Sequence, residues 1–211
     1  MKKSVLLELC EPVLSTYHYE GAASATIAAN PTIRNWFINQ AVELSCEKRF
    51  MNGYTTPSLR IVQSSFCANI HLERCNFQMK HLNGAIHTVI RALLDDGFFA
   101  AFCGIDDYYI PGKTWYKKRH FSHDGLICGY DQNDKTYTLY AYDENWRYTT
   151  FRTPQKCFEQ SRRAMFRKGE YGMLYGIKPS SHQVELDLSE ICKRLHSHLN
   201  SSFENYPPDG E

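Results

Sequence analysis

The sequence has almost no net charge. It contains 24 Lys and Arg against 23 Asp and Glu, which gives a formal net charge of +1 over 211 residues. Proteins that bind nucleic acid or an anionic membrane through their overall field carry a clear excess of basic residues. We therefore expect neither nucleic acid nor a membrane among the partners.

Long apolar runs are also missing. The run from Gly97 to Ile105 ends at Asp106 and Asp107, well short of the roughly 18 residues that a membrane-spanning helix needs. The shorter run at residues 5–9 is broken by Glu8, and no small-residue cleavage site follows it. These absences predict a soluble protein without a secretory signal.

The eight cysteines do not form a pattern typical of disulfides. They lie in apolar segments such as Phe66-Cys67-Ala68 and Ile127-Cys128-Gly129, which is typical of buried thiols in a reducing compartment. We therefore expect a cytoplasmic location.

What the sequence does contain is the composition of a folded domain, with 43% hydrophobic and 22% charged residues. Internal repeats and low-complexity tracts are absent, and we expect one domain over residues 1–199 with a flexible tail at 200–211. Apolar spacing predicts helices at 22–29, 31–50, 85–94, 154–166 and 184–199, and strands at 58–64, 98–105, 123–130, 136–142, 148–152 and 173–177. The expected fold is α+β, with a helical N-terminal half packed on an antiparallel sheet.

A histidine and an aspartate are predicted to face each other on that sheet. If the strands on either side of the turn at residues 131–134 pair, His123 at the start of the first lies opposite Asp143 at the end of the second. A carboxylate there could hold the imidazole in one tautomer, as in a Cys-His-Asp triad. A structural hydrogen bond between the two residues is the alternative. His120, three residues before His123, falls on the opposite face of the strand.

The region from Leu94 to Asp143 resembles a known family. It carries an Asp-x-Tyr-Tyr-Ile-Pro element at residues 106–111, a histidine six positions before Gly129-Tyr130-Asp131, and a strand that ends in Asp143. In these features it is similar to the N-terminal domain of the butirosin biosynthesis protein H family, which is itself similar to the bacteriocin-processing cysteine peptidases. The resemblance implies a papain-like fold, with His123 as base and Asp143 as the residue that orients it.

The cysteine nucleophile of that family has no counterpart in this sequence. The family motif places a cysteine at the start of an early helix, where the helix dipole lowers the thiol pKa. The matching position here is Ala22, or Ala23 if the register slips by one. The chain could be an engineered Cys→Ala variant, a natural member without the nucleophile, or an enzyme that uses another cysteine, of which Cys10 and Cys46 are the nearest.

The resemblance implies an acyltransferase of nonribosomal peptide or antibiotic biosynthesis. Such an enzyme moves an acyl group from the phosphopantetheine thioester of a carrier protein to a cysteine, and then to an amine to form an amide. It needs no cofactor of its own. A cysteine peptidase or amidase, or a non-catalytic binding protein, is the alternative. The residues assigned to substrate binding are Asp106, Tyr108, Tyr109, Trp115 and Tyr116.

Two further patterns carry weaker signals. The segment Trp115 to Arg119 mixes aromatic and basic residues, which is typical of a solvated loop, a lid or a docking site for an acidic carrier protein. Cys67, His71 and Cys75 would share one face of a helix, but three ligands on one straight helix splay apart, so we expect no metal site.

Overall fold

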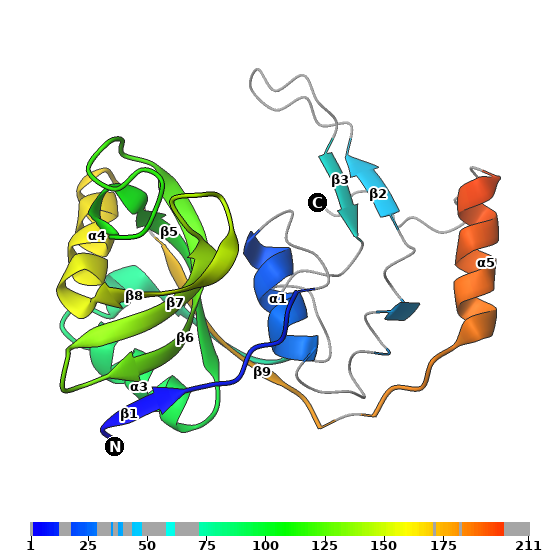
Figure 1. The fold of residues 1–211 in the computed structure, drawn as a ribbon, viewed down its shortest axis with the longest axis horizontal. Helices are drawn as coiled ribbons and strands as arrows, with labels where there is room; N and C mark the ends of the chain where they lie inside the picture. Colours follow the sequence, from blue (N-terminus) through cyan, green and yellow to red (C-terminus); the bar gives the residue numbers. More distant parts are fainter. Residues whose placement is uncertain are drawn as a thin grey trace.

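The computed structural model describes residues 2–12, 18–28, 35, 38–39, 44–47, 58–61, 72–170, 172–181 and 183–200 (Figure 1). Its strands are β1 (Ser4–Leu6), β2 (Leu44–Glu47), β3 (Ser58–Ile61), β4 (Leu72–Gln78), β5 (Phe99–Asp106), β6 (Ser122–Asp131), β7 (Thr136–Tyr142), β8 (Tyr148–Pro154) and β9 (Met173–Pro179). Its α-helices are α1 (His18–Ala28), α3 (Ile86–Asp95), α4 (Gln155–Arg167) and α5 (Leu188–Leu199), and the short 3-10 helices are η1 (Met79–His81) and η2 (Asp107–Tyr109).

The main sheet of the described chain is antiparallel, in the order β4-β9-β5-β6-β7-β8, and β1 pairs with the end of β6. β5 is central and has buried residues along both faces: Phe99 and Ala101 face α1, whereas Ala100 and Phe102 face α3 and α4. This alternation follows from the two-residue period of a strand. The sheet therefore lies between α1 on one side and α3 with α4 on the other (Figure 1).

Helix α1 reaches the sheet because its contact side chains are small. Ala22, Ala23 and Ala25 pack with Leu126 and Cys128 of β6 in one apolar cluster. Gly21 is equally constrained, since a Cβ there would lie 2.8 Å from the ring of Tyr148. The alanine-rich sequence of α1 thus serves close helix-to-sheet packing.

A bulge interrupts β5 just before the candidate site. The pairing of β5 with β6 shifts between Phe102 and Ile105, and Gly104 inside the bulge has φ +74°. A Cβ at Gly104 would lie 3.1 Å from the Cα of Gly172. Bulges change the direction of a strand and re-aim the residues that follow, here Asp106 and Asp107.

The predicted α+β class and antiparallel sheet are confirmed, but the predicted helical N-terminal half is not supported. Residues 44–47, predicted as the end of a helix over 31–50, form β2 and pair with β3 at Ser58–Ile61. Backbone pairing with a distant segment overrode the local helical spacing there. The tail at 201–211 lies outside the described residues.

The remaining predicted elements differ mainly at their ends. The last helix begins at Leu188 instead of residue 184, after Asp187, whose carboxylate accepts the backbone N–H of Glu190 at 2.9 Å. Strand β4 was missed, and Cys75 lies in it rather than on a helix. Within the described part of the chain, no helix is long and apolar enough to cross a membrane.

Candidate functional site

The candidate site lies where β5 ends and β6 begins. The backbone N–H of Asp107, directly after β5, donates to the carbonyl of Phe121 at 2.9 Å. This bond holds η2 against the segment that leads into β6. It brings two Asp–His pairs together at one end of the sheet.

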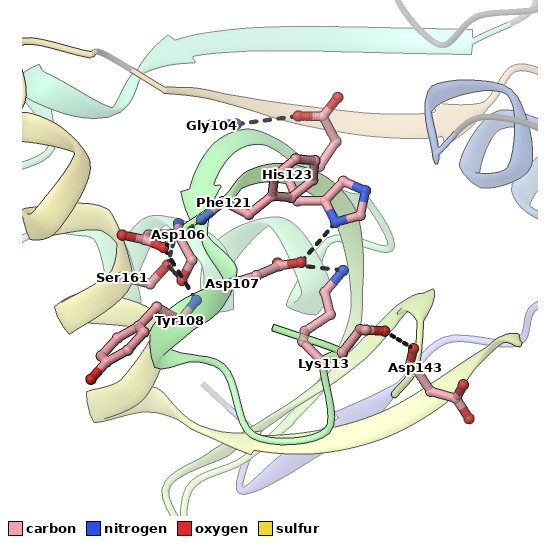
Figure 2. Close-up of polar contacts among 11 residues, drawn as sticks. Gly104, Asp106, Asp107, Tyr108, Lys113, Phe121, His123, Asp143 and Ser161 are labelled. Carbon is pink, nitrogen blue, oxygen red and sulfur yellow. Dashed lines mark hydrogen bonds and ion pairs between the residues drawn. The ribbon is translucent and has the colours of Figure 1, made fainter. Parts of the chain in front are cut away.

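His123 is paired with Asp107. Nδ1 of the imidazole lies 2.7 Å from Oδ2 of the Asp107 carboxylate, which is buried, while the His123 side chain is 21% exposed. An ionised carboxylate only accepts hydrogen bonds, so Nδ1 carries the proton. The other ring nitrogen, Nε2, points away from Asp107 (Figure 2).

Lys113 contacts the same carboxylate from below in Figure 2. Its Nζ lies 3.6 Å from Oδ1 of Asp107, and its side chain is 1% exposed. Burial lowers the pKa of Lys113, and the nearby carboxylates of Asp107 and Asp124 oppose that shift. His123, Asp107 and Lys113 therefore form one continuous polar chain that runs inward from the surface.

A second pair, His120 with Asp106, lies beside the first. Nδ1 of His120 lies 2.7 Å from Oδ2 of Asp106, but the His120 side chain is 49% exposed. The Asp106 carboxylate also accepts the backbone N–H groups of Tyr108 and Phe121, each at 3.2 Å. With these partners the Asp106 carboxylate, which is fully buried, connects the start of η2 to the segment before β6.

Asp124 follows His123 in β6, and successive residues of a strand point to opposite faces of the sheet. Its Oδ1 accepts the backbone N–H of Gly104 in the bulge at 3.2 Å. Burial raises the pKa of the Asp124 carboxyl, against the hydrogen bond from Gly104 and the charges of His123 and Lys113. Asp124 thereby ties β6 to the bulge of β5.

The predicted pairing of His123 with Asp143 is wrong. The Asp143 carboxylate accepts the backbone N–H of Asn145 at 2.8 Å and that of Arg147 at 2.9 Å, and it is bonded to the Arg147 guanidinium at 2.9 and 3.1 Å. Burial opposes ionisation of Asp143, but these bonds outweigh it and lower its pKa. The side chain serves the tight turn after β7 and points away from His123 in Figure 2.

The position predicted for the nucleophile is buried in the core. Ala22 is 1% exposed and Ala23 is 0% exposed, and both belong to the apolar cluster beneath α1. Ala22 is the fifth residue of a helix that begins at His18, so it is not at the helix start, where unpaired amides are found.

Neither Cys10 nor Cys128 offers a better position. Cys10 donates its backbone N–H to the carbonyl of Ala25 at 3.2 Å and is half-buried. Burial in the cluster beneath α1 raises the pKa of Cys128 to about 12. The side chain of Cys46 lies outside the described residues.

The residues predicted to bind substrate form two groups. The rings of Tyr108 and Tyr109 lie 5.1 Å apart, and Tyr108 stacks on His120 at 4.4 Å. Trp115 lies 6.2 Å from Phe121 and 6.3 Å from Trp146. Asp106, predicted with them, is buried by the contacts given above and has no exposed surface to offer a substrate.

Asp107 and Lys113 were missed by the sequence analysis. The signal for Asp107 was the doubled aspartate in the element at residues 106–111. Among the described residues, no group of His, Cys, Asp and Glu side chains is placed to hold a metal ion. No protein-family model and no curated protein sequence matches the chain.

Proposed function

We propose that this chain is an acyltransferase with a papain-like fold, which transfers an acyl group from a thioester to an amine with His123 as general base. The observation that carries the proposal is the 2.7 Å contact between Nδ1 of His123 and the buried carboxylate of Asp107. A buried carboxylate that fixes the tautomer leaves Nε2 as the basic nitrogen.

The family resemblance supports His123 as the base but gives the orienting role to Asp143. His123 lies six positions before Gly129, and Asp107 is the variable position of the element at residues 106–111, two of the three features on which the resemblance depends. The structural correction therefore replaces Asp143 by Asp107 as the orienting residue and leaves the base unchanged. Helix α1 packs on β6 and β7, as the early helix of a papain-like domain would.

The reaction needs one proton to be moved twice. The amine attacks the thioester carbonyl carbon and forms the C–N bond, while Nε2 of His123 accepts the amine proton. The C–S bond then breaks, and the imidazolium returns this proton to the departing thiolate. Asp107 stabilises the imidazolium, and Lys113 lies 3.6 Å from the other oxygen of the same carboxylate.

A direct attack by the amine fits the chain better than a route through an enzyme thioester. A cysteine at residue 22 would lie in an apolar cluster, where burial raises a thiol pKa and blocks access by the substrate. In the direct route, the acyl donor and the amine meet at His123, and no protein nucleophile is required.

The proposed acyl donor is carried by an acidic carrier protein. We define the aromatic–basic surface as Trp115, Phe121 and Trp146 with Lys117, Lys118 and Arg119. This surface adjoins the candidate site, because the ring centroids of Phe121 and His123 lie 5.1 Å apart. Trp146 is 57% exposed and the three cations are exposed. Positive charge beside exposed tryptophan suits an acidic protein surface.

The direct test is thiol release from acyl thioesters of N-acetylcysteamine in the presence of a panel of primary amines. The intact protein should release thiol and form amide, and His123→Ala and Asp107→Asn should each lower the rate on the order of 10²–10⁴-fold. His120→Ala is the matched control, because it removes an imidazole with the same 2.7 Å contact to a neighbouring aspartate. It should retain activity.

Two results would overturn the proposal: no thiol release from the intact protein, or equal losses in the His120 and His123 variants. Intact-protein mass spectrometry of Ala22→Cys after the same incubation tests the alternative route. A stable acyl adduct that requires His123 would replace direct attack by the enzyme thioester.

A non-catalytic binding protein is the second candidate, and the burial of Ala22 and Ala23 favours it. This candidate predicts that thioesters or amines raise the melting temperature of the intact protein while no thiol is released. A variant in which the charges of Lys118 and Arg119 are reversed further distinguishes the acyltransferase from the binding protein. An acyltransferase would then show a higher KM for a carrier-bound thioester and an unchanged rate with the small thioester.

A further inference from the structure

A cavity lies at the other end of β6, away from His123. It has a volume of about 590 Å³, and we name it the α4 cavity; its lining residues are His87, Asp134, Lys135, Pro154, Gln155, Lys156, Glu159, Gln160 and Arg163. His123 is the second residue of β6 and the turn with Asp134 and Lys135 follows the last. At the rise of an extended strand, the two sites are about 26 Å apart.

The carboxylates that line the α4 cavity are paired with arginines. Arg152 is shared between Asp134, at 3.2 Å, and Asp131, which is not part of the lining, at 3.4 Å. Glu159 is bonded to both Arg162 and Arg163 at 2.7 Å, and these bonds outweigh burial and lower the pKa of Glu159. One carboxylate held between two guanidinium groups leaves an excess of positive charge at this wall.

The two lysines of the lining add to this excess. Lys135 and Lys156 are both exposed, and within the described chain neither forms an ion pair with a carboxylate. Lys135 is held in place by the backbone, because its carbonyl accepts the N–H of Gln155 at 2.9 Å. The bond joins the β6–β7 turn to the first residue of α4, the neighbour of Lys156 in the sequence.

His87 supplies a neutral hydrogen-bond donor. Its Nδ1 lies 2.6 Å from the hydroxyl of Tyr137, and burial lowers the pKa of His87. Burial also raises the pKa of Tyr137, whose hydroxyl therefore keeps its proton. If that hydroxyl donates to Nδ1, both buried polar groups are satisfied and the remaining proton of the ring lies on Nε2.

We propose that the α4 cavity is a binding site for a small dianion of the phosphate monoester class, held by Lys135, Lys156 and the Nε2–H of His87. Arg163 contributes further positive charge through its shared contact with Glu159. A dianion suits this lining better than a carboxylate, because the two unpaired lysines carry two positive charges and a carboxylate carries only one negative charge.

The test is a titration of the intact chain with inorganic phosphate and with glycerol 3-phosphate, at constant ionic strength, followed by amide and imidazole NMR signals. Saturable shifts are expected at Lys135, Lys156 and His87 with either ligand, and none with glycerol. The double variant Lys135→Ala, Lys156→Ala should weaken binding by at least about tenfold, since it removes two charge-assisted contacts.

Lys193→Ala, which removes one exposed lysine of α5, is the matched control and should bind like the intact chain. Shifts that stay linear and spread over many surface lysines would overturn the proposal. So would a double variant that binds as tightly as the intact protein. Because the readout does not involve thiol release, the result is independent of the acyl-transfer proposal.

Discussion

Nζ of Lys113 lies 3.6 Å from Oδ1 of Asp107, and both side chains are almost fully buried. Within the described chain neither of these two atoms has a hydrogen-bond partner. Each is therefore compensated by the charge of the other, across the ion pair. A buried charge is costly when its partner is removed, even where the intact pair adds little net stability.

Lys113→Met should therefore destabilise the protein by about 3–5 kcal/mol, because the carboxylate of Asp107 loses its cation in a buried site. Urea denaturation of the variant measures this change. Lys118→Met, at an exposed lysine of the same loop, is the control and should stay within about 0.5 kcal/mol of the intact protein. Equal stability of both variants would contradict the ion pair.

Asp124→Asn should stabilise the protein at neutral pH. The pKa of Asp124 is raised in the folded state by burial, so the native protein binds this proton more tightly than the unfolded chain. The penalty is absent below the unfolded pKa and complete above the folded pKa. The gain from asparagine should accordingly shrink as the pH falls through that window, as measured by thermal melts between pH 3 and 7.

Asp143→Asn is the opposite control for that experiment. The pKa of Asp143 is lowered, since the hydrogen bonds from Arg147 and Asn145 outweigh burial. Its stabilisation is present above the unfolded pKa and is lost as the pH falls through the folded pKa. Asp143→Asn should be less stable than the intact protein at pH 7, and the two should converge in acid. The same sign of change in both variants would refute these assignments.

Gly104→Ala should cost more stability than Gly84→Ala. Both glycines have φ +74°, but a Cβ at Gly84 has no atom within 4 Å, whereas one at Gly104 meets the backbone of Gly172 at 3.1 Å. The shared conformational cost is about 1–2 kcal/mol, so urea denaturation of the pair isolates the steric contact. Because the bulge at Gly104 sets the direction of Asp107, the Gly104 variant should also slow thiol release, whereas Gly84→Ala should not.

The candidate site shows where sequence reasoning ends. The register that pairs Leu126 with Tyr140 would, if continued, bring Asp143 opposite His123, as the sequence predicted. The pairing stops at Leu126 and Tyr140, and Asp143 turns toward Arg147 instead. The partner of His123 comes from the strand on its other side, beyond a bulge whose position no residue spacing reveals.

Local patterns predicted the sheet and its helices well, because most of these elements are amphipathic or apolar over their whole length. Thr136–Tyr142 has the predicted ends, and α3 differs from its prediction by one residue at each end. β2 and β4 were missed because each depends on a partner far along the chain: Leu44 pairs with Ile61, and Cys75 with Gly176. Such pairing carries little signal in the strand's own residues.

The place of β9 in the sheet has a consequence for synthesis of the chain. Although β9 is the last strand of the described residues, it lies between β4 and β5 and pairs with both. A nascent polypeptide that has not yet left the ribosome beyond residue 172 therefore presents unpaired edges on β4 and β5 at the same time, and such edges favour aggregation. The bulge that shapes the His123 site can pack against Gly172 only after that residue has left the ribosome, when the rest of the bulge has already been synthesised.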